Sequence, residues 1–145
     1  MAISLAVLML VWAGDAKAGE IDGKALVCSG TSSSYPELDN TYILFKGGYV
    51  FNYYIFYRNG DFNLYSNEKR KISYTVEEDE VIWSYKNIDL TTVNRETLVL
   101  SHHQSLTKSS WVWDQQCRLT NYQGLINASD RDIEARKASM KKNKL

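Results

Sequence analysis

Segments in which apolar and polar residues alternate follow one another along most of the chain. Because successive side chains of an extended strand point to opposite faces, such alternation predicts strands with one face on a core and one in water. In the segment 111–119, for example, Trp111, Trp113 and Cys117 share a mainly apolar face, whereas Asp114 lies on the polar one. We therefore expect this segment to be the closing strand of a sheet.

The same pattern, together with the turn residues between segments, predicts about nine short strands. They are expected at residues 24–28, 42–45, 49–57, 61–65, 71–76, 81–85, 88–93, 97–101 and 111–119. Gly47-Gly48 and Asn59-Gly60 predict tight hairpins, because these residues adopt positive φ angles readily. The polar stretches 29–40 and 102–110 are interpreted as loops. This spacing favours an all-β fold, a small antiparallel meander barrel of about eight or nine strands with a short C-terminal α-helix.

The C-terminal segment has a helical rather than a strand pattern. Ser129-Asp-Arg-Asp132 is typical of a capping box, and several bases follow toward the C-terminus, where the helix dipole favours them. The apolar face is thin, mainly Ile133 and Met140, so we expect a short helix that docks weakly. Residues 19–126 are assigned to the barrel and 127–145 to the C-terminal helix or tail.

Residues 1–18 have the pattern of a secretory signal peptide. The apolar run 1–13 is too short to span a bilayer, and it is followed by Ala16-Lys17-Ala18, an A-x-A sequence of the kind that signal peptidase accepts. We expect the mature chain to start near Gly19, to be secreted or periplasmic, and to contain no transmembrane segment.

The two cysteines, Cys28 and Cys117, lie in the first and the last predicted strands. In an oxidising compartment they can pair, and the bond would close a loop of roughly 90 residues, for which chain entropy predicts about 4 to 5 kcal/mol of stabilisation. The alternative is that both are free and buried, where cysteine behaves as a small apolar residue.

Charge and motif content narrow the function. The chain has 17 basic and 17 acidic residues, and this balance excludes a nucleic-acid binder, which needs a basic stripe to neutralise phosphates. Motifs for a nucleophile, a phosphate loop or a zinc protease do not occur, so we expect neither catalysis nor a cofactor. A pair of carboxylates brought together in space, as in glycosidases, stays open as an alternative.

Two clusters of possible metal ligands are interpreted as solvated segments. The neighbouring residues His102 and His103 would point to opposite sides of an extended chain, so they are assigned to a solvated loop and not to a metal site. The acidic run Glu77–Glu80 lacks the spaced ligands and the glycine of a calcium loop and is assigned to a solvated turn. The sequence therefore predicts no bound metal.

The segments 81–83 (Val-Ile-Trp) and 94–100 (Asn-Arg-Glu-Thr-Leu-Val-Leu) are similar to the late strands of small exported bacterial proteins with a lipocalin-like (calycin) barrel. In such proteins an early Gly-Lys-x-x-x-Cys, here Gly23 to Cys28, pairs with a late cysteine. The resemblance implies a small exported barrel, although the Gly-x-Trp of true lipocalins is missing from the first strand. An end-to-end disulfide of this kind also occurs in small periplasmic barrels that inhibit lysozyme.

Aromatic residues on the predicted strands are the candidates for a binding role. They are Tyr49, Phe51, Tyr53, Trp83, Trp111 and Trp113. Around a cavity inside the barrel they could hold a small apolar ligand, and on the outside they could anchor a protein partner, as in a periplasmic inhibitor. They could also simply fill and brace the barrel. We therefore expect a monomeric, non-catalytic binding protein whose partner is a small apolar ligand or another protein.

Overall fold

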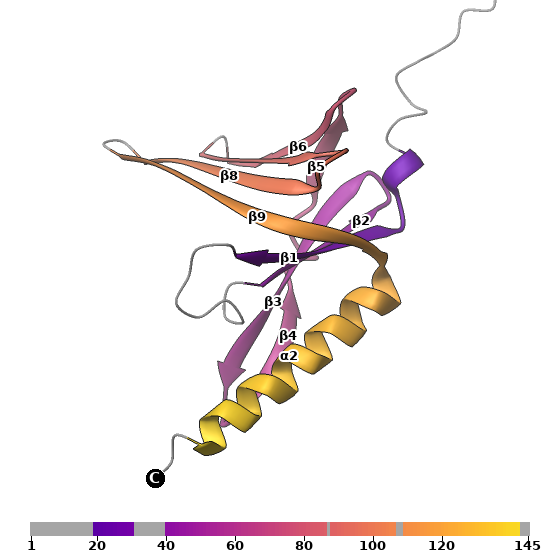
Figure 1. Ribbon diagram of the computed structural model, residues 1–145. Helices are drawn as coiled ribbons and strands as arrows, with labels where there is room; N and C mark the ends of the chain where they lie inside the picture. The colour runs from indigo at the N-terminus through magenta and orange to yellow at the C-terminus, as the bar shows by residue number, and fades with distance from the viewer. Residues whose placement is uncertain (1–18, 31–39, 87, 107–108, 143–145) are drawn as a thin grey trace, which may run out of the picture.

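The computed structural model describes residues 19–30, 40–86, 88–106 and 109–142 (Figure 1). The strands in these ranges are β1 (Lys24–Gly30), β2 (Thr41–Lys46), β3 (Tyr49–Arg58), β4 (Asp61–Ser66), β5 (Ile72–Val76), β6 (Glu80–Tyr85), β7 (Asp89–Asn94), β8 (Val99–Leu106) and β9 (Ser109–Asn121). The long helix α2 (Tyr122–Lys142) follows them. The predicted signal peptide, residues 1–18, lies outside the described residues, and so does most of the predicted loop 29–40.

The sheet closes on itself as an antiparallel barrel, as the sequence predicted. Neighbouring strands pair in the order β2-β1-β9-β8-β7-β6-β5-β3-β4, and an additional pairing of β2 with β3 completes the ring. Eight strands form the closed barrel, and β4 is an extra strand outside it. The two predicted hairpin turns are also confirmed, because Gly47, Gly48, Asn59 and Gly60 all have positive φ angles.

Strand β3 belongs to two parts of the molecule. Its first half pairs with β2 and, at Tyr49 and Val50, also with β5. From Tyr54 to Arg58 its only partner among the described strands is β4. The far end of the β3–β4 hairpin is therefore a two-stranded ribbon outside the barrel, and Figure 1 shows it running beside α2, away from β5, β6 and β8.

The core inside the barrel is apolar and aromatic. Side chains at alternate positions of each strand point inward, as the pleat requires. Leu26 of β1 and Phe45 of β2 are buried there with Val50 of β3. The Phe45 ring packs edge to face against Tyr74, with centroids 5.1 Å apart, and against Trp83, with centroids 5.8 Å apart.

A second apolar cluster lies outside the barrel, beneath α2. Val27 of β1 and Leu44 of β2 point away from the barrel interior and pack in one cluster with Leu125 and Ala128 of the helix. Full burial of a leucine side chain stabilises a fold by roughly 1.5–3 kcal/mol, so Leu125 holds the helix in place. The expectation that this helix docks weakly stays a prediction, and the burial of Leu125 and Ala128 argues against it.

Helix α2 begins at Tyr122, earlier than the capping box predicted at Ser129. The cap is Asn121, whose side-chain oxygen accepts a hydrogen bond from the Gly124 amide at 2.9 Å, the usual N-cap interaction. Ser129 is instead buried inside the helix, where its hydroxyl donates to the Ile126 carbonyl at 2.8 Å. The prediction missed the start because it gave the cap to the wrong polar residue.

A polar contact fastens the middle of α2 to the barrel wall. The Tyr42 hydroxyl of β2 donates to Asp132, and the Asn40 side-chain amide donates to the same carboxylate at 2.6 Å. Burial and the hydrogen bond to Asp132 raise the pKa of Tyr42 well above its ordinary value. The tyrosine therefore stays protonated and keeps donating to the helix at physiological pH.

The predicted disulfide between Cys28 and Cys117 is confirmed. The two residues lie directly opposite each other in the β1–β9 ladder, and both are buried in the core inside the barrel. The alternative of two free cysteines is wrong, because the two sulfur atoms are bonded to each other. The bond therefore joins the first strand of the barrel to the last.

One predicted loop is in fact mostly strand. Residues 102–110 were expected to connect two strands, but β8 runs on to Leu106 and β9 already starts at Ser109. His102 and His103 are therefore ladder residues, paired with Trp113 and Val112 of β9. His102 therefore lies in the wall of the barrel and not in a solvated loop.

Candidate functional site

The aromatic residues selected from the sequence do not form one site. Trp83 is buried in the core inside the barrel, whereas Phe51 and Tyr53 lie outside it, against the cluster beneath α2. Trp111 and Trp113 belong to β9, but their side chains lie outside the described part of the structure. Of the described side chains in this set, Trp83 thus lies inside the barrel and Phe51 and Tyr53 lie outside it.

Tyr49, Phe51 and Tyr53 instead line a groove on the outer surface, with a volume of about 640 Å³. Tyr122, the first residue of α2, lines it too, and its ring centroid is 6.3 Å from that of Tyr53. The Tyr53 hydroxyl donates to Glu68 at 2.8 Å. Burial, with this hydrogen bond, raises the pKa of Tyr53. The groove is therefore braced by its own contacts, and its aromatic rings largely serve to seat the helix.

A second pocket, of about 260 Å³, lies at one end of the barrel interior. The inward alternation of the strands continues there, but the side chains become polar. It is lined by Asn52, Asn67, Arg70, Ile72, Trp83, Tyr85, Asp89, Leu90, Thr91, His102 and His103. We call this pocket the barrel mouth. Its position places the polar groups beside the buried Trp83 ring.

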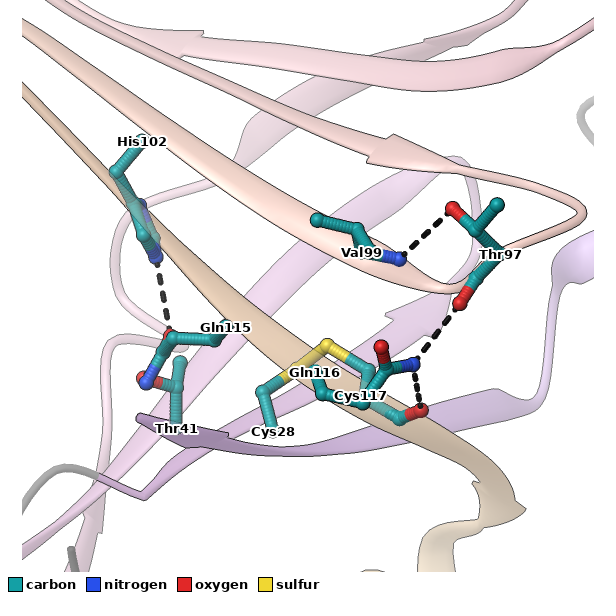
Figure 2. The surroundings of a disulfide bond; sticks show 8 residues. All are labelled: Cys28, Thr41, Thr97, Val99, His102, Gln115, Gln116 and Cys117. Atoms are coloured by element: carbon teal, nitrogen blue, oxygen red, sulfur yellow. Dashed lines mark hydrogen bonds between the residues drawn. A yellow bond between two sulfur atoms is a disulfide. The ribbon is translucent and has the colours of Figure 1, made fainter. Parts of the chain in front are cut away.

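One wall of the barrel mouth is a hydrogen-bonded group around His102. Gln115 of β9, only 3% exposed, accepts a hydrogen bond from the Thr41 hydroxyl at 2.9 Å and lies 3.3 Å from His102 Nε2. His102 Nδ1 lies 3.3 Å from the Thr91 hydroxyl. Figure 2 shows His102, Gln115 and Thr41 converging next to the disulfide. Gln115 is two residues from Cys117, and Thr41 pairs with Cys28 in the β1–β2 ladder. The disulfide therefore lies next to both residues and helps to hold them in place.

Burial lowers the pKa of His102. Its hydrogen bond to Gln115 and the carboxylates of Asp89 and Asp114 act in the opposite direction, and His103 adds to the lowering. The neutral ring is consistent with the contacts, since Nε2–H can donate to the Gln115 oxygen while Nδ1 accepts from Thr91.

Two oxygen atoms at the barrel mouth have no hydrogen-bond donor. Asp89 Oδ1 and Asn52 Oδ1 are buried, and neither accepts a hydrogen bond within the described part of the chain. A buried acceptor left in this state costs roughly 1–3 kcal/mol, and more when it carries charge. Such groups are uncommon in folded proteins, and here two of them line one pocket.

A third surface feature lies on the β3–β4 ribbon. Tyr54 and Phe56 point away from the helix and are about half exposed, at 49% and 53%. The ring centroid of Tyr65 on β4 lies 6.3 Å from that of Tyr54 and 5.9 Å from that of Phe56. These three rings, here called the ribbon patch, share the face of the β3–β4 ribbon opposite Ile55 and Leu64, which pack against the cluster beneath α2. Exposed aromatic clusters of this kind are typical of interaction surfaces.

Sequence reasoning missed most residues of the barrel mouth. Thr91 and His102 lie on strands but are polar and inward-facing, so they break the apolar alternation that identifies a core face. Asn52 carried the only local signal, as a lone amide among the apolar and aromatic residues of β3.

The acidic turn at Glu77 and Glu78 is exposed, and their carbonyls accept hydrogen bonds from Arg95.

Comparison of the chain with protein-family models, with curated proteins and with solved structures finds no match. Among the residues that the structure describes, no group of three or more potential metal ligands lies together. In the same ranges, no helix is both long and apolar enough to cross a membrane. The function must therefore be argued from the site itself.

Proposed function

We propose that this protein is a non-catalytic binding protein that holds a small polar molecule at the barrel mouth. The observation that carries the proposal is the pair of buried, unsatisfied oxygens, Asp89 Oδ1 and Asn52 Oδ1, inside a pocket bordered by Trp83. A ligand that offers hydrogen-bond donors would remove their desolvation cost and would contact the aromatic ring at the same time. The eight-stranded barrel is compatible with such a role.

The proposal keeps the binding role expected from the sequence but changes the ligand from apolar to polar. A carrier of apolar molecules in the manner of lipocalins needs a largely apolar cavity, whereas most residues that line the barrel mouth carry polar groups. Pockets for drug-sized ligands have volumes of roughly 300–1,000 Å³. The barrel mouth, at about 260 Å³, therefore favours a smaller molecule.

We also propose that the protein acts outside the cytosol, in a periplasm or after secretion. The Cys28–Cys117 disulfide supports this location, because such bonds persist in oxidising compartments and are rare in the cytosol. The signal-peptide pattern of residues 1–18 supports it independently.

The test of the binding role is an NMR titration of the oxidised protein with a library of small polar molecules. A true ligand should shift the side-chain amide of Asn52 and the backbone amides of Asp89 and Thr91. Asp89→Asn should weaken binding, and Asp79→Asn, an exposed acid in the β5–β6 turn, is the matched control. Shifts confined to the outer groove, at Tyr49 and Phe51, would move the site there, and a complete lack of response would contradict the proposal.

A second candidate function is docking of a protein partner on the ribbon patch. The specific observation is the exposure of Tyr54 and Phe56 on a sheet face outside the barrel, beside the open backbone edge of β4. Aromatic anchors and a free strand edge are both common devices of protein recognition. A partner of this kind should be retained by the wild type and by Asp89→Asn but lost by Tyr54→Ser/Phe56→Ser. Equal retention by the double variant would exclude the ribbon patch.

A further inference from the structure

The barrel mouth contains an acid and a base that do not pair with each other. Asp89 and Arg70 line the same pocket, yet among the described residues neither forms an ion pair with a lysine, arginine, aspartate or glutamate, and the Asp89 carboxylate acts electrostatically on His102, whose pKa is lowered by burial. A partly buried carboxylate without a counter-charge is unfavourable, because desolvation is not repaid by attraction. Each of the two charges is therefore available to a ligand.

The base is positioned by an aromatic ring. The Arg70 guanidinium lies 4.9 Å from the centroid of Tyr85, and Lys86 lies over the same ring at 5.3 Å. A guanidinium that stacks on a ring with its face keeps its N–H edges available to donate. Those edges have the geometry that matches a carboxylate, with two parallel hydrogen bonds. Arg70 is thus suited to hold a carboxylate at the rim of the pocket.

A second buried acceptor without a donor lines the same pocket as the acid. Asp89 Oδ1 and Asn52 Oδ1 are both buried and both without a donor among the described residues. An ammonium group supplies three donors and a positive charge, so it can satisfy both oxygens and neutralise the carboxylate. A hydroxyl could donate to only one of them and would leave the charge of Asp89 unbalanced.

We infer that the barrel mouth binds a small zwitterion, with its ammonium group between Asp89 and Asn52 and its carboxylate on Arg70. The inference rests on the proposed function and names the ligand class for that pocket. The apolar residues of the lining, Trp83 and Leu90, are left to contact the rest of the molecule. A free α-amino acid is the simplest compound of this class and is compatible in scale with a pocket of about 260 Å³.

The test is isothermal titration calorimetry of the full-length, disulfide-intact protein with the common α-amino acids. Any amino acid that binds is compared with its methyl ester, which lacks the carboxylate, and with its N-acetyl form, which lacks the ammonium group. Each derivative should bind at least ~10-fold more weakly, as expected for loss of a charged hydrogen bond. The derivatives test both charges without any change to the protein.

Two variants assign the charges to residues. Arg70→Gln should lower the affinity for the amino acid to that of its ester and leave the ester unaffected. Asp89→Asn should lower the affinity for the amino acid to that of its N-acetyl form and leave the affinity for the N-acetyl form unchanged. Lys69→Gln and Asp79→Asn are matched controls, since both residues are exposed and neither lines the pocket. Both controls should bind like the wild type.

The possible outcomes distinguish failure of the zwitterion inference from failure of the proposed binding function on which it rests. If a derivative binds as tightly as its parent amino acid, the zwitterion is overturned. It is also overturned if no amino acid binds while another polar molecule shifts the Asn52 and Asp89 resonances, and the proposed function then stands. If no polar molecule of either kind reaches the barrel mouth, both are overturned.

Discussion

His102 is the residue whose pKa shows most clearly the effect of burial and of its position in the barrel wall. It lies on an inward-facing position of β8, in contact distance of Thr91 and Gln115, and burial lowers its pKa. A lowered pKa means that the folded state holds the neutral ring and the unfolded chain binds the proton more readily. Stability should therefore depend on pH through this one side chain.

The first prediction concerns that dependence. As the pH falls below about 6.5, the ordinary value for histidine, the unfolded chain takes up the proton first, so the free energy of unfolding decreases. Above this pH the contribution of His102 no longer changes. His102→Gln should lose less stability than the wild type between pH 7.5 and pH 5, as measured by urea denaturation. His103→Gln, at an exposed neighbouring position, removes only one contribution to the lowered pKa of His102 and should stay closer to the wild type than His102→Gln does. Identical pH profiles for the two variants would contradict the assignment.

Single residues also set the limit of what the sequence could predict. Cys28 and Cys117 were identified correctly, because their types and their places at the two ends of the chain are visible without a structure. The strand pattern placed Gln115 on the same core face as Cys117, but His102 was assigned to a loop, because alternation identifies a core face only while that face is apolar. Asp89 could not be selected either, since its lack of a donor is a property of the folded pocket.

At the scale of elements, strand alternation predicted the barrel well and the helix poorly. Side-chain polarity alternates every two residues along the strands, and strong turn residues such as Asn59-Gly60 separate one strand from the next. The number of strands and their order along the chain therefore follow from the pattern. Helix α2 begins directly after β9, and nothing in the composition marks the change of period. Its buried face is short, and its first buried residue, Leu125, lies before the predicted cap. The seating of the helix depends on the outward faces of β1 and β2.

The second prediction tests where the helix begins. Asn121→Ala removes the side-chain acceptor of the Gly124 amide and should cost about 1 kcal/mol of unfolding free energy, the usual effect of losing an N-cap. Ser129→Ala should cost less, because Ser129 lies inside the helix and alanine is a better helix former. Urea denaturation of the two variants measures the difference. A larger loss for Ser129→Ala would return the cap to the position that the sequence indicated.

A third prediction concerns how the helix is held. The Leu125 side chain of α2 is fully buried against the outer faces of β1 and β2. Leu125→Ala should therefore lower the free energy of unfolding by about 2–5 kcal/mol. Ile133→Ala, further along the helix at a half-buried position, is the comparison and should cost less. Hydrogen exchange should show faster exchange in α2 for the Leu125 variant. A small effect on both stability and exchange would mean that the helix docks as weakly as its sequence suggested.

At the scale of the whole molecule, closure of the barrel and the disulfide act on the same pair of strands. The β1–β9 ladder runs from Lys24 opposite Asn121 to Gly30 opposite Gln115, and the disulfide lies within it. The strands that close the ring are thus joined by backbone hydrogen bonds and by a covalent bond. The ladder and the buried residues on both faces of β1 specify the register, and the disulfide restricts the unfolded chain.

This division of roles leads to the last prediction. Replacing both cysteines by alanine should lower the free energy of unfolding by about 4–5 kcal/mol from chain entropy alone, because the bond closes a loop with a sequence separation of 89. The far-ultraviolet circular dichroism spectrum at low temperature should stay that of a barrel, since the ladder is intact. Reduction of the wild type is the control for lost packing, because the thiols then remain in the core. A barrel that no longer forms after either treatment would show that the disulfide is required for closure itself and does more than stabilise a ring that the strands already specify.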